Sequence, residues 1–197
     1  MKQLPIIVIA ILSIAVGVWL GQQDSEPQTA QSGFEHLGGD FTLQSDKGPV
    51  SLSDFKGKVV PIYFGYTHCP DVCITSLNKM TAALSSMSEA ERAELQPIFI
   101  SVDPERDDAT TVGEYARYFN PAIIGLTATP DTIAEVAKRY LVIYEKVAIE
   151  GSAMDYAVDH SSIIYVVGRD GQIKSLVHHA DTAEALVDYL REALKDT

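Results

Sequence analysis

The chain has 197 residues, which is enough for one compact domain with a short appendage. It carries 27 acidic and 15 basic side chains, for a formal net charge of −12. Because non-specific binding to nucleic acid requires a basic surface, this charge argues against a nucleic-acid partner.

The N-terminal stretch of residues 4–20 is apolar and contains no charged side chain. A helix of this length just spans the hydrocarbon core of a membrane. Lys2 precedes the stretch and no Lys or Arg follows before Lys47, so the positive-inside bias places the N-terminus in the cytoplasm. We therefore expect residues 1–20 to form a single transmembrane anchor in a bacterial inner membrane, with the C-terminal domain in the periplasm. A cleaved signal peptide is the open alternative.

A polar segment at residues 21–33 has no apolar period and predicts a flexible tether. We expect one folded domain over residues 34–197. Its first element is a predicted β-hairpin, in which residues 34–43 and 49–52 pair around a turn at 45–48.

Apolar runs that favour strands then alternate with segments of helical period. We expect strands at 59–64, 96–102, 123–126 and 141–147, and helices at 70–86, 110–119 and 131–140, the last capped by Asp131. The chain should end with a hairpin of strands 160–167 and 173–178, followed by a helix that begins at Asp181 or Thr182 and buries Tyr189 on its inner face. This order predicts an α/β domain with a mixed central sheet flanked by helices.

The two cysteines, Cys69 and Cys73, lie where the predicted strand 59–64 gives way to a helix. In a helix, residues four apart share one face with Cα atoms about 6 Å apart, which permits either a disulfide or joint ligation of one ion. A disulfide that closes so short a loop constrains the unfolded chain little, so redox or metal chemistry explains the pair better. Thiolates are soft ligands that select Cu(I) or Zn over Ca or Mg, and a third ligand should come from elsewhere in the fold.

Five histidines are available. His160 begins a predicted strand and could swing over the mouth of the sheet as the third ligand; a partly buried histidine bonded to a backbone carbonyl is the alternative. His68 could lower a thiolate pKa but is expected in an exposed loop. His178 and His179 are adjacent in a strand and should point to opposite faces, which disfavours a metal pair.

Three motifs in the domain carry a family resemblance: YFGYTHCPDVC at 63–73, ISVDPERD at 100–107 and YAVDHSSIIYVV at 156–167. Together they make roughly residues 34–195 similar to the Sco/SenC family of membrane-tethered, thioredoxin-like copper proteins of cytochrome oxidase assembly. The resemblance implies a thioredoxin-like fold with an N-terminal β-hairpin extension. The usual family pattern has a proline after the second cysteine, where this chain has Ile74; we expect a slightly altered first helical turn and no lost ligand.

The resemblance also implies a site and a function. Cys69 and Cys73 correspond to two thiolate ligands and His160 to an imidazole ligand of Cu(I) or Cu(II). The implied protein is a copper metallochaperone that supplies the binuclear copper site of cytochrome c oxidase subunit II. Asp159 is a candidate for orienting the His160 ring, and Asp103 for shaping the acidity or docking surface of the site, with loop capping as the alternative for each.

The redox-active pair Cys69 and Cys73 leaves two other functions open. A membrane-anchored thiol–disulfide reductase would prepare the cysteines of the oxidase subunit without any metal. A peroxide-reducing or redox-signalling protein could use the same fold. Besides the oxidase subunit, we expect a second partner, either another periplasmic copper carrier or a thiol reductant.

Overall fold

A computed structural model describes residue 34, residues 36–148 and residues 155–196. The predicted anchor and the predicted tether lie outside the described residues, as do residues 149–154. Within the described ranges, no helix is both long enough and apolar enough to cross a membrane.

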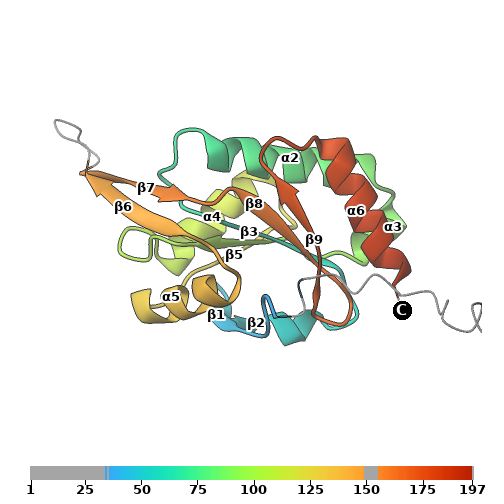
Figure 1. Cartoon of the computed structure of the whole chain (residues 1–197), viewed down its shortest axis with the longest axis horizontal. Coiled ribbons are helices and arrows are strands. Elements are labelled where there is room, and N and C mark those ends of the chain that lie inside the picture. Colours follow the sequence, from blue (N-terminus) through green and yellow to red (C-terminus); the bar gives the residue numbers. More distant parts are fainter. Residues whose placement is uncertain (1–33, 35, 149–154, 197) are drawn as a thin grey trace, which may run out of the picture. The chain divides into compact units, whose positions relative to one another are not determined.

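A mixed five-stranded sheet forms the centre of the domain (Figure 1). Its strands lie in the order β5 (Ile124–Leu126), β4 (Ile98–Ser101), β3 (Val60–Gly65), β8 (Ile163–Val167) and β9 (Ile173–His178). Strands β3, β4 and β5 are parallel, whereas β8 is antiparallel to both β3 and β9. Every residue of β3 is buried, as expected for a central strand covered on both faces. The predicted mixed α/β architecture is confirmed.

Helices cover one face of the sheet: α2 (Val72–Ser86) lies against both α4 (Ala109–Phe119) and α6 (Ala183–Lys195). The other face is covered by α5 (Pro130–Arg139), whose C-cap residue Tyr140 packs on Phe64 and Tyr165. Successive side chains of a strand point to opposite faces, so Tyr63 of β3 faces α2 while Phe64 faces α5. The end of β3 therefore presents its side chains and loop directly to the start of α2.

The predicted N-terminal hairpin is confirmed as β1 (Thr42–Ser45) and β2 (Gly48–Ser51), although its first strand is shorter than expected. A short 3₁₀ helix, η1 (Leu52–Phe55), follows it, and α3 (Glu89–Ala93) connects α2 to β4. Three predictions about helices need correction. Helix α2 begins at Val72 rather than residue 70 because residues 66–71 form a turn, and α5 is capped by Thr129 rather than Asp131. Tyr189 is 36% exposed, and Val187 takes the buried position instead.

The segment before β8 differs most from the prediction. Strands β6 (Tyr144–Ala148) and β7 (Tyr156–His160) form a separate two-stranded antiparallel hairpin, outside the central sheet. His160 therefore ends β7 and does not begin β8. Ser161 and Ser162 separate β7 from β8. The Ser161 amide still donates to the Ile143 carbonyl, which continues the β6–β7 ladder past His160, so the chain joins the central sheet only at Ile163.

We expect Gly125→Ala to lower the free energy of unfolding by about 2 kcal/mol or more, because overpacking against backbone cannot relax. A Cβ atom at Gly125 would lie 2.6 Å from the carbonyl carbon of Val112 and 2.8 Å from the Gly113 nitrogen. Urea denaturation measures the loss. Gly113→Ala is the matched control, since the nearest atoms to its Cβ outside its own helix backbone would be movable side-chain atoms of Arg117 and Asp46, at 3.1 to 3.3 Å. Equal losses in both variants would contradict this account of close β5–α4 packing.

Candidate metal centre

The two cysteines are placed by different elements. Cys73 lies in the first turn of α2 and is fully buried, whereas Cys69 lies in the loop between β3 and α2 and is 6% exposed. Both are free thiols. The Cys73 backbone amide lies 3.5 Å from the Cys69 sulfur and donates to it. A thiol held by backbone amides at a helix N-terminus is stabilised as a thiolate.

The His160 ring reaches the cysteines from the end of β7. Its Nε2 atom lies 3.3 Å from the Cys73 sulfur, across 87 positions of sequence. Its Nδ1 atom lies 3.2 Å from the carbonyl oxygen of Ser161, to which it can donate. The ring also stands edge-on to Tyr63 and Tyr66, with centroids 6.1 and 5.8 Å away. With Nδ1 protonated and bonded to a carbonyl, a neutral ring presents its Nε2 lone pair to the sulfur side.

The possible ligand atoms of Cys69, Cys73 and His160 all lie within 4.8 Å of one another. Among the described residues, this is the one group of three or more His, Cys, Asp or Glu side chains that could hold a metal ion. Two sulfurs and one imidazole nitrogen form a donor set for soft and borderline metals such as copper or zinc, and they suit Ca²⁺ or Mg²⁺ poorly. The structure thus brings together all three residues named as ligands from the sequence, and their role as ligands stays a prediction.

The two thiols differ in electrostatic environment. A hydrogen bond from the Cys73 thiol is the largest influence lowering the pKa of Cys69, and His160 and the backbone amides of Asp71 and Cys73 also lower it, against the effect of burial. The pKa of Cys73 is raised, first by its hydrogen bond to Cys69, then by burial and by the negative charge on Cys69. The lowered pKa of Cys69 and the raised pKa of Cys73 make Cys69 the cysteine that ionises first.

Polar side chains beneath the site connect three elements. The Tyr63 hydroxyl lies 3.2 Å from the Ser162 hydroxyl, which in turn lies 3.2 Å from the hydroxyl of Ser76 in α2. Tyr63 also donates to the Val72 carbonyl at 3.4 Å. Tyr63 is fully buried, and no sequence pattern signals the contacts of its hydroxyl.

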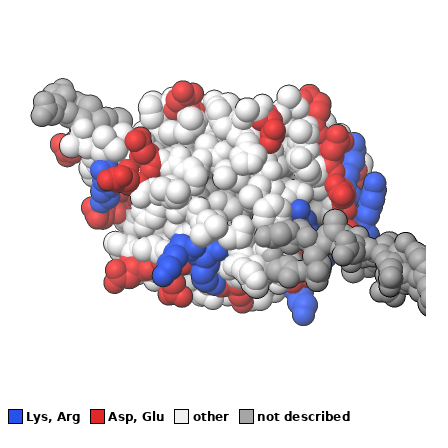
Figure 2. Space-filling model, in the orientation of Figure 1, with Lys and Arg blue, Asp and Glu red and all other residues white. Residues whose placement is uncertain are grey.

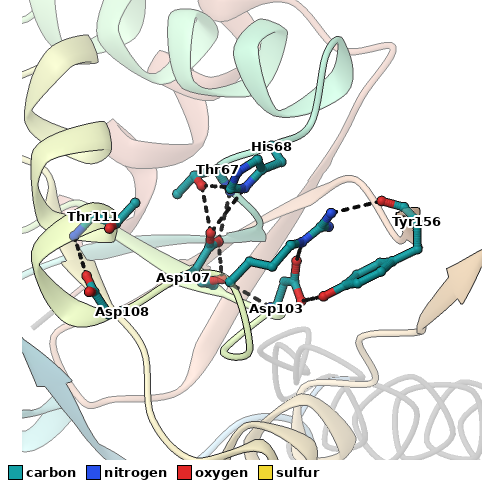
Figure 3. Close-up of polar contacts among 9 residues, drawn as sticks. Thr67, His68, Asp103, Asp107, Asp108, Thr111 and Tyr156 are labelled. Carbon is teal, nitrogen blue, oxygen red and sulfur yellow. Dashed lines mark hydrogen bonds and ion pairs between the residues drawn. The ribbon is translucent and has the colours of Figure 1, made fainter. Parts of the chain in front are cut away.

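Two fully buried carboxylates, Asp103 and Asp107, follow β4 (Figure 3). Neither belongs to the cysteine–histidine cluster. Asp103, which the sequence analysis named, accepts from Arg106 at 2.5 Å and from the Tyr156 hydroxyl at 2.7 Å. Asp107, which it did not name, accepts from the Thr67 amide and hydroxyl at 2.9 and 2.6 Å. A second carboxylate four positions beyond Asp103 in the same motif could have drawn attention to Asp107. Nothing in the sequence pairs Tyr156 with this loop.

The predicted contribution of Asp159 is not supported by the geometry. Its side chain is exposed on β7, opposite Glu145 in the β6–β7 register. The Nδ1 atom of His160, which Asp159 was expected to hold, lies against the Ser161 carbonyl instead. Because neighbouring strand residues point to opposite sides, Asp159 and His160 diverge.

The remaining histidines lie outside the cluster. His68 is 44% exposed, with Nδ1 3.1 Å from the Thr67 hydroxyl and 3.5 Å from Asp107. His178 is exposed at the end of β9, and the carbonyls of His178 and His179 accept from Lys79. Ile74 is 39% exposed and follows Cys73 within α2, so its departure from the usual family proline leaves the cluster intact.

Curated relatives of this chain are named SCO1 and SCO2 homologs. The Arabidopsis thaliana protein SCO1 homolog 1, mitochondrial, is 44% identical over 137 residues, which are 69% of this chain and 40% of that protein. The Mus musculus SCO2 homolog, mitochondrial, is 37% identical over 155 residues, which are 78% of this chain and 60% of that protein. The matched region thus spans roughly half the length of these two relatives.

Solved structures of Sco proteins share the fold. Arabidopsis thaliana ScoI with copper bound has a TM-score of 0.75 and 38% identity, covering 82% of this chain and 99% of that one. Bradyrhizobium japonicum ScoI with copper bound has a TM-score of 0.72 and 40% identity, covering 80% and 99%. BsSco, described as a Sco-family cytochrome c oxidase assembly protein with a disulfide switch, has a TM-score of 0.65 and 25% identity, covering 83% and 96%.

These similarities confirm the thioredoxin-like fold class expected from the sequence. The sequence pattern of the SCO1/SenC family matches residues 29–195, which contain both cysteines, His160 and the loop after β4. With this match and relatives above 30% identity over more than two thirds of its length, the chain belongs to the SCO1/SenC family.

Proposed function

We propose that this protein is a copper metallochaperone of cytochrome c oxidase assembly. The observation that carries the proposal is the cluster of Cys69, Cys73 and His160, whose ligand atoms all lie within 4.8 Å of one another. Support comes from the two ScoI structures with copper bound, which are 38% and 40% identical to this chain.

The donor set suits a protein that must hold copper and later release it. Two thiolates favour Cu(I), while the imidazole is a borderline ligand that accepts both oxidation states. Because the pKa of Cys73 is raised, binding is expected to remove its proton and release it to solvent. His160 is only half-buried at the end of a hairpin, so it is the ligand that an acceptor could replace first.

We infer that the acceptor is the binuclear copper site of cytochrome c oxidase subunit II. An anchor at residues 1–20, a tether at 21–33 and a domain from residue 34 would hold the copper site near a membrane-bound oxidase, on the periplasmic side of a bacterial inner membrane. The description of BsSco as a cytochrome c oxidase assembly protein supports this choice of target.

A second candidate function, thiol–disulfide reduction of the same target, is favoured by the unequal pKa values of the cysteines. The Cys69 thiolate would attack a target disulfide and displace one target thiolate. Cys73, after losing its proton to that thiolate, would attack the Cys69 sulfur and release the second target sulfur. The target would gain two electrons, and the pair Cys69–Cys73 would lose them. The disulfide switch named for BsSco supports this chemistry.

Copper titration tests the first function. We expect the reduced full-length protein to bind one equivalent of Cu(I), and Cys69→Ser or Cys73→Ser to weaken binding by at least about 100-fold. Loss of an outer partner of a metal site already costs roughly 10–100-fold, and these residues are direct ligands. Competition with a Cu(I) chelator measures the affinity.

His160→Ala should weaken Cu(II) binding more than Cu(I) binding, since imidazole suits the divalent ion better than thiolates do. His178→Ala is the matched control, because His178 is exposed and lies outside the cluster. Tight stoichiometric binding that survives either cysteine substitution would rule out the proposed site.

Reduction of a disulfide-containing fragment of subunit II by copper-free His160→Ala protein tests the second function. A reductase should retain its rate within about threefold in this variant, because the cysteine pair does the chemistry. A metallochaperone without reductase activity would leave the fragment oxidised. Free thiols appearing on the fragment are counted by mass spectrometry after alkylation.

The pKa difference has its own test. At pH 6 an ordinary thiol is below about 1% thiolate, but Cys69 should still be ionised because its pKa is lowered. In the unmodified protein, iodoacetamide should therefore react with Cys69 at least about tenfold faster than with Cys73, as mass spectrometry of the alkylated peptides measures. Faster modification of Cys73 would reverse the assignment of the attacking thiol.

A further inference from the structure

The loop between β4 and α4, residues 102–108, contains two carboxylates with no exposed surface, Asp103 and Asp107. Burial of a carboxylate is costly unless its oxygens are paired, and here the oxygens of both side chains have partners. One partner of Asp103, Tyr156, belongs to the hairpin that carries His160, and one partner of Asp107, Thr67, belongs to the segment that carries Cys69. The other partners, Arg106 and Ser101, lie in the loop itself and in β4.

The histidine side is held through Asp103. Its carboxylate accepts from the Tyr156 hydroxyl at 2.7 Å and from Arg106 Nε at 2.5 Å. Arg106 also donates to the Tyr156 carbonyl at 2.9 Å, and its guanidinium lies 3.7 Å from the Tyr156 ring centroid (Figure 3). Tyr156 begins strand β7 and His160 ends it, so these contacts fasten the far end of the strand that presents the imidazole.

The β6–β7 hairpin needs contacts of this kind to hold its position on the domain. Strands β6 and β7 pair only with each other in a two-stranded sheet, and an isolated hairpin is marginally stable in water. After Tyr144, the residues of β6 are exposed. A second contact comes from the same loop, because Lys146 of β6 pairs with Glu105 at 2.6 Å.

The cysteine side is held through Asp107. Its carboxylate accepts from the Thr67 amide at 2.9 Å, from the Thr67 hydroxyl at 2.6 Å and from the Ser101 hydroxyl at 2.6 Å. Thr67 and His68 directly precede Cys69 in the turn after β3. The bonds to Thr67 therefore set where this turn leaves the sheet and hence where the Cys69 sulfur lies.

We propose that the loop of residues 102–108 positions both halves of the metal site: Asp103 holds His160 through Tyr156 and Arg106, and Asp107 holds Cys69 through Thr67. Asp103, Asp107, Tyr156 and Thr67 are positioning residues that do not contact the ion. The consequence for copper rests on the proposed metallochaperone function, whereas the consequence for the hairpin does not.

Tyr156→Phe tests the histidine side, because it removes the hydroxyl and keeps the ring beneath Arg106. Tyr144→Phe is the matched control, since it removes a hydroxyl from the paired strand of the same hairpin, at the end of the ladder opposite Tyr156. In the copper-free full chain, we expect Tyr156→Phe to speed amide hydrogen exchange of residues 156–160 by at least about tenfold, the effect of losing one hydrogen bond to a charged group. Tyr144→Phe should stay within twofold of the unmodified protein.

Copper provides a second measurement. With Cu(II) bound, the nitrogen hyperfine coupling of the imidazole in the EPR spectrum should weaken or become heterogeneous in Tyr156→Phe and remain unchanged in Tyr144→Phe. Copper should also dissociate roughly fivefold faster from Tyr156→Phe. Thr67→Val tests the cysteine side: copper should be lost faster while exchange of residues 156–160 stays at the unmodified rate.

The outcomes separate the proposals. Unchanged hydrogen exchange in Tyr156→Phe, or an equal change in Tyr144→Phe, overturns the positioning role of Asp103. Unchanged copper loss in Thr67→Val, from a protein that does bind copper, overturns that of Asp107. If the unmodified protein binds no copper, the metallochaperone function fails. The role of Asp103 is then decided by hydrogen exchange in Tyr156→Phe. The role of Asp107 is decided by the alkylation rate of Cys69 in Thr67→Val, a rate that should change if the turn is released.

Discussion

The contact between the Cys73 sulfur and His160 Nε2, at 3.3 Å, is the interaction on which the rest of the site depends. It joins the first turn of α2 to the end of β7, two elements with no hydrogen-bonded ladder between them. Three local features make it available: β7 ends at His160, the Ser161 carbonyl takes the Nδ1 hydrogen, and Ser162 lies 3.2 Å from Ser76 of α2. Without this contact the protein would hold only a dithiol.

Around this contact, buried polar side chains position the segments that carry the three ligands, inside a largely apolar core. Tyr63, Ser76 and Ser162 connect the sheet to α2, and Asp103 and Asp107 connect the loop after β4 to both ligand-bearing segments. Burying a polar group without a partner costs free energy, and pairing it forms a hydrogen bond with a preferred direction. Such contacts therefore specify positions more narrowly than apolar packing can, which is what a site requiring three converging atoms needs.

Metal binding and thiol chemistry draw on the same two sulfurs in different protonation states. The pKa of Cys69 is lowered and that of Cys73 is raised, which favours a Cys69 thiolate suited to attack on a disulfide. A metal ion would take both as thiolates and so displace the Cys73 proton. The two proposed activities are therefore alternative states of one site.

The charged regions of the face shown in Figure 2 lie mainly at its periphery, leaving much of the surface uncharged.

The sequence by itself determined the order of most elements, the mixed α/β class and the residues that could form the site, because strand and helix periodicity are local and the three motifs are distinctive. Only the tertiary structure decided that His160 ends a separate hairpin, that Ser161 rather than Asp159 holds its ring, and that Asp103 and Asp107 pair with Tyr156 and Thr67. The physical reason is sequence separation. Partners such as Asp103 and Tyr156, 53 positions apart, meet only after the sheet has formed, and no local pattern of either segment encodes the other.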